Sequence, residues 1–196
     1  MRAISKILVK FFQTFINRFK YKFDIPFDVE YINLPITYSC NARCVMCDIW
    51  KINKEDPEKL NSEITVPQLI EFFEKNKSRL KRLKNIGITG GEPSLKENLI
   101  ELIRYLRKNY PQVRIGIQTH GLTPKKILPW VSEIYKVNPN VGIAVSLDGM
   151  RESHEKMRGI SKAFERTLET IKGVQEIGVK EITCGLTITK WNIDDI

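Results

Sequence analysis

The sequence predicts an α/β fold in which parallel strands are joined by helices. From residue 31 onward, short apolar segments rich in Ile and Val alternate with amphipathic segments. Strict alternation of strand and helix is typical of parallel sheets with right-handed crossovers, as in a barrel or a doubly wound sheet. The chain has 196 residues, of which 42% are hydrophobic and 28% charged, so it can bury a single core of ordinary size.

The first 23 residues predict a basic amphipathic helix. Residues 1–24 hold six Lys or Arg and one Asp, a net +5 of the chain's +9. Charged residues interrupt the apolar ones, so the segment is too polar to span a bilayer, and it lacks the cleavage site of a signal peptide. Two roles stay open, a helix on an anionic membrane surface and a helix packed on protein. Its apolar positions, spaced by three and four, are Ile4, Ile7, Leu8, Phe11, Phe12, Phe15, Ile16 and Phe19.

We expect residues 1–30 to form this helix and a linker, and residues 31–196 to form the folded core. The strands expected in the core are residues 34–38, 85–89, 114–119, 141–147 and 181–188. Several of them are apolar almost throughout, which is typical of strands covered on both faces. Cys184 lies inside the last one and is expected to be a buried, small apolar residue.

Capping residues indicate where the helices between these strands begin and end. Thr65 to Gln68 and Ser94 to Glu97 both have the form of a capping box, before helices expected at residues 69–80 and 99–108. A third helix is expected from Thr123-Pro124, and a fourth over residues 163–176 that stops at Gly178. Asn192, followed by two aspartates, resembles the start of a further helix at the end of the sequence.

Three cysteines, Cys40, Cys44 and Cys47, follow the first expected strand in Cys-x3-Cys-x2-Cys spacing. The carboxyl end of a strand is where parallel α/β folds place functional groups. Three thiolates are one ligand short of a structural zinc site, unless Cys184 or one of the two histidines approaches in space. A cubane iron–sulfur cluster can instead be held by three cysteines with its fourth iron open to a ligand. An iron–sulfur cluster is therefore favoured, with zinc as the alternative.

Two other classes of protein are disfavoured. Three of the four cysteines fall within eight residues, which does not resemble a secreted disulfide framework, so a reducing cytoplasm is expected. Nucleic-acid binding is not favoured, because over half of the positive excess lies in the leader rather than on the core. The basic run at residues 75–84 follows two glutamates near a helix end, where cations are favoured by the helix dipole.

The cysteine loop resembles the signature of radical S-adenosylmethionine enzymes, and two further strand ends agree. The second strand ends in Thr89-Gly90-Gly91-Glu92-Pro93, similar to the family's GGE motif. The fourth ends in Ser146-Leu147-Asp148-Gly149, followed by His154 and Arg158-Gly159. The resemblance covers residues 33–192 and implies a partial (β/α) barrel of six units. Since five strands are expected, it also implies that a sixth strand and any auxiliary-cluster domain lie beyond residue 196.

The resemblance implies a [4Fe–4S] cluster on Cys40, Cys44 and Cys47, with the cofactor S-adenosylmethionine beside it. Glu92 and the Gly91 backbone would then contact the cofactor's ammonium group. The resemblance also implies that Gly90 allows close backbone approach and that Met46 lies near the adenine. Ser146 would contact the ribose or carboxylate of the cofactor, and Arg158 would contact the carboxylate. Asp148 would contact the ribose or take part in substrate chemistry, unless it only forms a turn.

Two positions depart from the family's pattern. Met46 stands where an aromatic residue is common, so adenine affinity is in question. His120 stands where the third strand end often carries asparagine, which places a titratable imidazole near the expected cofactor rim. The other histidine, His154, is expected at a helix start or behind the residues that touch the cofactor.

The implied function is reductive cleavage of S-adenosylmethionine to a 5′-deoxyadenosyl radical, which abstracts hydrogen from a substrate. The motifs are most like the branch that modifies peptides or carries a SPASM-type domain, so a peptide is the first substrate expected. A small ferredoxin- or flavodoxin-like protein is expected to donate the electron. The alternative is a non-catalytic α/β scaffold, stabilised by zinc or a cluster, that docks on a membrane or a partner through its leader helix.

Overall fold

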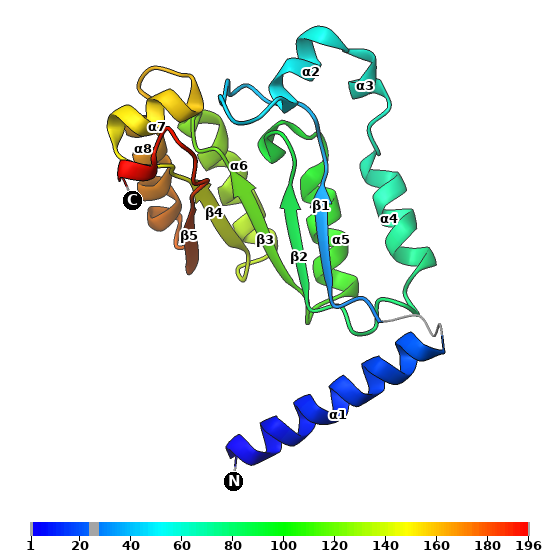
Figure 1. The fold of residues 1–196 in the computed structure, drawn as a ribbon. Coiled ribbons are helices and arrows are strands. Elements are labelled where there is room, and N and C mark those ends of the chain that lie inside the picture. The colour runs from blue at the N-terminus through cyan, green and yellow to red at the C-terminus, as the bar shows by residue number, and fades with distance from the viewer. Residues whose placement is uncertain (1, 24–27, 196) are drawn as a thin grey trace.

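A computed structural model describes residues 2–23 and 28–195, with backbone only for residues 2–10, 13 and 53. The five strands form one sheet in the order β1-β2-β3-β4-β5, and every neighbouring pair is parallel (Figure 1). Their bounds are β1 Tyr31–Pro35, β2 Asn85–Thr89, β3 Arg114–Thr119, β4 Gly142–Ser146 and β5 Glu181–Gly185. Sequential order with parallel pairing is that of a partial barrel, so the predicted fold class is confirmed.

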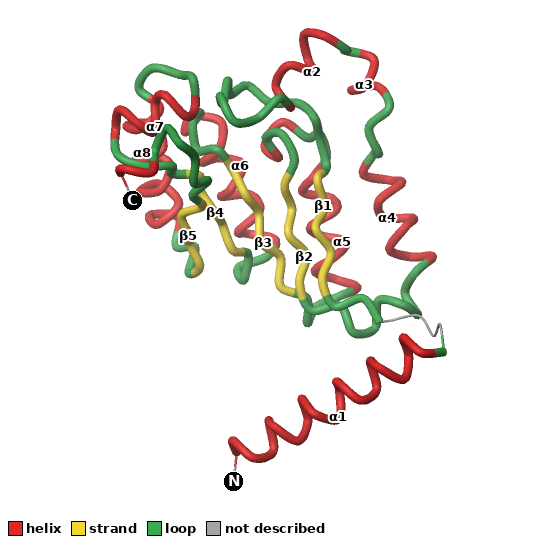
Figure 2. Tube along the Cα trace, in the orientation of Figure 1, coloured by secondary structure: helices red, strands yellow, loops and turns green. Residues whose placement is uncertain are grey.

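Helices cover one face of this sheet (Figures 1 and 2). The helices that supply the core on that face are α4 Val66–Lys75, α5 Leu99–Asn109, α6 Pro124–Val137 and α8 Ala163–Ile177. Isoleucines of the strands, such as Ile88 and Ile117, are almost fully buried against them. The apolar face of the sheet therefore fixes where the helices sit.

The opposite face of the sheet carries small or polar residues in β2, β3 and β4. Gly87, Gly116 and Gly142 lie side by side across β2, β3 and β4 and line a cavity of about 180 Å³ with Thr89 and Gln118. The expectation that the strands are covered on both faces is therefore wrong for the described residues. In β2 and β3, Ile alternates with Gly or polar residues, and this period of two leaves one face without bulky apolar side chains.

The expected bounds are correct for β2 and β3 and wrong at the two outer strands. β1 begins and ends three residues earlier than expected, because it pairs with β2 from Tyr31 to Pro35. β5 ends at Gly185, because Thr187 donates its N–H to the Asp148 side chain instead of extending the ladder. Cys184 is exposed on this outer strand, so its expected burial is also wrong.

The helix starts follow the sequence pattern in most places. Thr65 and Gln68 form the predicted capping box, and Gly178 ends α8 in the left-handed conformation, with a φ of 95°. The second predicted box is wrong. Ser94 lies in a short 3-10 helix, η1 Pro93–Leu95, where its N–H is bound by Glu92, and α5 begins after Asn98 without a side-chain cap.

Three short helices were not predicted from the sequence. They are α2 Ile49–Glu55, α3 Glu58–Asn61 and α7 Arg151–Arg158. Of the eight residues of α7, His154, Met157 and Arg158 are buried, and such a short polar segment has no clear apolar period. The helix expected after Asn192 is a single 3-10 turn, η2 Ile193–Asp195.

The predicted leader helix is confirmed as α1 Arg2–Lys22. It lies beyond the amino ends of the strands, away from the edge of the sheet where the cysteine loop is found (Figure 1). Lys20 forms an ion pair of 3.2 Å with Asp28 at the start of the core. The side chains of Ile4, Ile7 and Leu8 lie outside the described residues. No helix in the described part of the chain is long and apolar enough to cross a membrane.

His154 ties the loop after β4 to α8. It is fully buried, its Nδ1 accepts the Asp148 N–H at 3.1 Å, and its Nε2 lies 3.1 Å from the Thr167 hydroxyl. Burial, followed by the charge of Arg158, lowers the pKa of His154 to about 4. The imidazole is therefore neutral and structural at physiological pH.

The free energy of unfolding should fall between about pH 6.5 and pH 4, because the unfolded chain binds a proton that folded His154 rejects. Urea unfolding at pH 7.5 and pH 5.5 measures this. The native chain should lose about 1 kcal/mol more than the His154→Gln variant over this interval. Equal losses would show that His154 is not held neutral.

Candidate functional site

A cavity of about 290 Å³ lies at the carboxyl ends of the strands. It brings together residues from the cysteine loop, the Gly-Gly turn after β2, the end of β4 and the end of α7. The predicted site residues that line it are Cys40, Cys44, Cys47, Met46, Gly90, Gly91, Ser146 and Arg158. A larger cavity of about 540 Å³ between α5 and α6 contains none of them, so we place the chemistry in the smaller one.

The Gly-Gly turn holds the start of the cysteine loop. The N–H of Gly91 donates to the Thr37 carbonyl at 2.7 Å, and the N–H of Glu92 donates to the Ser39 carbonyl at 2.8 Å. A Cβ on Gly91 would overlap the Ser39 carbonyl, and Gly90 has a φ of 125°. Both glycines are therefore required by backbone approach and conformation.

The end of α7 holds the middle of the loop. The Arg43 N–H donates to the Arg158 carbonyl at 3.1 Å, and the Val45 N–H donates to the Met157 carbonyl at 3.0 Å. Carbonyls in the last turn of a helix have no partner within the helix, so the loop supplies their donors. Gly159 follows with a φ of 64°, and a Cβ there would overlap the Arg43 carbonyl. Cys44 is thus fixed on both sides by one helix end.

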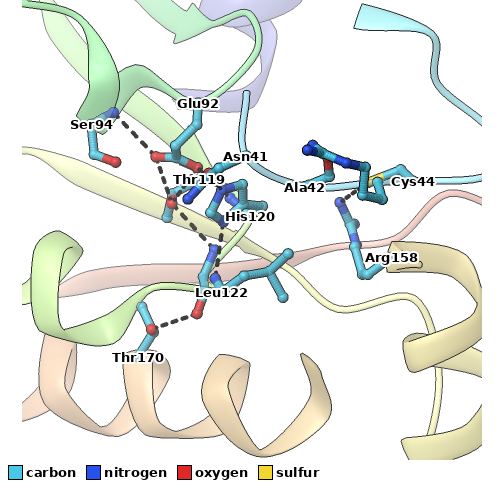
Figure 3. Close-up of polar contacts among 12 residues, drawn as sticks. Asn41, Ala42, Cys44, Glu92, Ser94, Thr119, His120, Leu122, Arg158 and Thr170 are labelled. Atoms are coloured by element: carbon cyan, nitrogen blue, oxygen red, sulfur yellow. Dashed lines mark hydrogen bonds and ion pairs between the residues drawn. The ribbon is translucent and has the colours of Figure 1, made fainter. Parts of the chain in front are cut away.

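Glu92 lies behind the cavity wall and not on it. Its side chain is fully buried and accepts hydrogen bonds from the Ser94 N–H at 3.1 Å, the Thr119 hydroxyl at 2.9 Å and the His120 N–H at 2.9 Å. Figure 3 shows the carboxylate directed at these groups. The predicted contact with a cofactor ammonium would require the carboxylate to leave these donors.

His120 connects the end of β3 to the cysteine loop. Its Nδ1 accepts the Leu122 N–H at 2.9 Å, so Nε2 carries the proton and donates to the Asn41 side chain at 2.7 Å (Figure 3). Burial is the main cause that lowers the pKa of His120, although Glu92 opposes it. The imidazole is therefore neutral, with both nitrogens engaged, and it positions Asn41 between two of the cysteines.

Asp148 and Arg158 form a buried ion pair beside Cys44. The Arg158 Nη2 lies 2.6 Å from an Asp148 oxygen, and its Nη1 donates to the Cys44 sulfur at 3.6 Å. Asp148 is fully buried and accepts the Thr187 N–H at 3.0 Å through its other oxygen. Arg158 therefore lines the cavity, whereas Asp148 does not and instead holds the guanidinium.

Two contacts to the cysteine loop come from residues that the sequence analysis did not assign there. Glu63 accepts hydrogen bonds from the Thr37 hydroxyl and the Lys96 ammonium, both at 2.9 Å, and fixes the chain just before the loop. Trp50 donates from Nε1 to the Cys44 carbonyl at 3.1 Å. No sequence motif marks Glu63.

The three thiols fit a metal centre that they share. None of the three is in a disulfide and all three line one cavity, although no three His, Cys, Asp or Glu side chains in the described ranges converge on a point suited to a single ion. Burial raises the pKa of Cys40 to about 11, and burial also raises the pKa of Cys44, against the effect of Arg158. Both thiols are therefore protonated on their own, and a bound metal centre would displace the protons.

Comparison with known proteins agrees with this geometry. Residues 34–196 match the Radical SAM superfamily. Fe-coproporphyrin III synthase of Methanosarcina barkeri is 31% identical over 82% of this chain and 37% of that protein. GTP 3′,8-cyclase of Helicobacter pylori is 30% identical over 86% of this chain and 50% of that protein. Mycofactocin maturase MftC of Mycolicibacterium smegmatis is 25% identical over 82% of this chain and 37% of that protein. The chain thus spans half or less of the length of these relatives.

A solved structure shows the same fold. SuiB of Streptococcus suis superposes with a TM-score of 0.61 at 17% identity, over 86% of this chain and 35% of that one. At this identity the likeness concerns the arrangement of strands and helices alone.

Gly159→Ala should release the cysteine loop from α7, because an alanine there is strained at positive φ and its Cβ would overlap the Arg43 carbonyl. In the metal-free protein, Cys44 is only 7% exposed, so we expect its alkylation by iodoacetamide to become at least about tenfold faster.

Gly178→Ala is the matched control. Gly178 also has a positive φ, but its Cβ would meet only Tyr135, far from the loop, at 3.5 Å or more. Cys44 should stay protected in this variant. Equal protection in both variants would show that α7 does not hold the loop.

Proposed function

Because the chain belongs to the radical SAM superfamily, we propose that it cleaves S-adenosylmethionine reductively to generate a 5′-deoxyadenosyl radical. Members of this superfamily use a [4Fe–4S] cluster and S-adenosylmethionine. The observation that carries the proposal is the convergence of three cysteine side chains, a Gly-Gly turn and one guanidinium on a single cavity.

The roles of the residues follow from where they lie. Cys40, Cys44 and Cys47 would hold three irons as thiolates. When bound, the reduced cluster supplies the one electron that breaks the bond between sulfur and C5′ of the cofactor. The other residues of the site would bind and orient the cofactor.

We assign the cofactor contacts to the residues that line the cavity. The backbone of Gly90 and Gly91 would approach the methionyl group, Met46 would contact the adenine, and Ser146 would donate to the ribose or carboxylate. Arg158 retains donors for the cofactor carboxylate. Glu92 and Asp148 act one layer behind, by holding His120 and Arg158 in place.

The substrate that we propose is a peptide. Two relatives support it by name, mycofactocin maturase MftC and the sporulation killing factor maturation protein SkfB of Bacillus subtilis, the latter 27% identical over 83% of this chain. A small ferredoxin- or flavodoxin-like protein would supply the electron, and a reducing cytoplasm would keep the thiols free to bind iron.

Anaerobic reconstitution with iron and sulfide tests the proposal. The protein should turn brown, hold about four irons per chain and form 5′-deoxyadenosine from S-adenosylmethionine under dithionite. Cys44→Ala should lose both the full cluster and product formation, because Cys44 is one of the three proposed thiol ligands that line the cavity.

Cys184→Ala is the control, because Cys184 is exposed on β5 and does not line the cavity. This variant should bind as much iron and form as much 5′-deoxyadenosine as the native chain. A colourless protein that retains one zinc ion and forms no product would overturn the proposal and favour the non-catalytic scaffold.

We also propose that α1 lies on an anionic membrane surface. On the described part of this helix, Phe11, Phe12 and Phe15 are 65% to 73% exposed and Phe19 is just over half exposed. These residues share one side of the helix, and the net +5 of residues 1–24 complements anionic headgroups. The helix stands apart from the catalytic end of the sheet, so the cavity stays accessible (Figure 1).

The variant Phe11→Ser/Phe15→Ser/Phe19→Ser should bind vesicles of phosphatidylglycerol and phosphatidylcholine at least about tenfold more weakly, because each phenylalanine loses apolar burial. Tyr21→Ser is the control, since Tyr21 is 80% exposed and lies on the other side of the helix. Co-sedimentation measures both variants. Unchanged vesicle binding by the triple variant would contradict the proposal, as would self-association of the native chain through this face.

A further inference from the structure

We propose that Arg158 donates a hydrogen bond to the cluster-ligating sulfur of Cys44 and thereby raises the reduction potential of the cluster. The inference rests on the proposed function, because it requires that Cys44 hold iron. It assigns to Arg158 a role toward the cluster itself, in addition to the carboxylate contact that the sequence predicts. Arg158 is thus a tuning residue that acts through a ligand.

The guanidinium of Arg158 forms a hydrogen bond to the sulfur of Cys44 without any metal present. Nη1 of Arg158 donates to the Cys44 Sγ at 3.6 Å, a normal distance for a hydrogen bond to sulfur, and Arg158 is only 7% exposed (Figure 3). Buried hydrogen bonds and charges act in a medium of low dielectric, so their effect on the sulfur is weakly screened.

Asp148 holds this orientation. Nη2 of Arg158 lies 2.6 Å from one Asp148 oxygen, while the other oxygen accepts the Thr187 N–H at 3.0 Å. The Asp148 carbonyl accepts a hydrogen bond of 2.7 Å from the Asn192 side chain. The carboxylate is therefore fixed independently of the arginine. One end of the guanidinium is anchored, and the other is directed at the sulfur.

The backbone fixes the distance between the two partners. The carbonyls of Met157 and Arg158 accept the N–H groups of Val45 and Arg43, the residues on either side of Cys44. The donor and the sulfur are thus joined by contacts on both sides of Cys44, so the hydrogen bond does not depend on a flexible side chain finding its partner.

The charge and hydrogen bond of Arg158 should shift the reduction potential of the cluster in one direction, upward. Reduction adds one negative charge to a cluster whose charge is spread over iron and sulfur. A donor and a positive charge at a ligating sulfur stabilise the reduced form more than the oxidised form, and hydrogen bonds to the sulfurs are among the levers that set cluster potentials. Removing Arg158 should therefore lower the potential.

The test is a potentiometric titration of the reconstituted protein without S-adenosylmethionine, followed by the electron paramagnetic resonance of the reduced cluster. Arg158→Met removes the donor and the charge, and its midpoint potential should lie below that of the native chain. If Arg158 acted only on the cofactor carboxylate, the potential without cofactor would be unchanged, and the inference would be overturned.

Two further variants keep the comparison clean. Lys156→Met makes the same charge change on an exposed residue of the same helix and should leave the potential unchanged. Arg158→Met/Asp148→Asn avoids leaving a buried carboxylate unpaired, so it should hold its cluster better. Because it also removes the negative charge of Asp148, it is compared with Asp148→Asn, and its potential should lie below that of Asp148→Asn. Equal potentials in these two variants would overturn the inference.

A measurement on the native chain does not depend on any variant folding. Arginine labelled with ¹⁵N in its guanidinium group should give a ¹⁵N hyperfine coupling in the pulsed resonance spectrum of the reduced cluster without cofactor. Absence of that coupling would overturn the inference while the proposed function stands. Failure of the native chain to assemble a cluster would overturn both, and iron analysis distinguishes the two results.

Discussion

The site depends on backbone contacts that hold the cysteine loop at its start and in its middle. Gly91 and Glu92 bind the carbonyls at its start, and the last turn of α7 binds the N–H groups on either side of Cys44. Gly91 and Gly159 are needed because any Cβ would collide with the loop's own carbonyls. These backbone contacts fix the course of the loop, so the three thiols line one cavity before any metal is bound.

Behind this loop lie two buried carboxylates, and each holds a basic side chain. Glu92 positions His120 through its backbone N–H, and Asp148 positions Arg158 through an ion pair. A buried carboxylate is costly unless its oxygens are satisfied. Glu92 accepts several hydrogen bonds, whereas Asp148 accepts the Thr187 N–H and forms an ion pair with Arg158. As a result, the neutral imidazole of His120 and the cationic guanidinium of Arg158 line the cavity, and the carboxylates of Glu92 and Asp148 lie behind its wall.

Much of this arrangement was predictable from local patterns. The bounds of β2 and β3, the capping box at Thr65 and the end of α8 at Gly178 follow from apolar spacing and capping chemistry, which depend on nearby residues. The motifs at successive strand ends also converge as parallel topology requires. Helix α7 was not predictable in this way, because its eight residues have no clear apolar period. The contact of Glu63 with the chain before the loop and the direction of the Glu92 carboxylate were not predictable either, because both depend on long-range packing.

The central claim is that three thiols in this preorganised loop hold a cubane cluster and leave its fourth iron for the cofactor. Mössbauer spectroscopy of protein reconstituted with ⁵⁷Fe tests it directly. We expect about one quarter of the iron signal to move to a new isomer shift when S-adenosylmethionine is added, while the rest stays in place. A spectrum with all iron sites equally ligated, unchanged by the cofactor, would contradict the account.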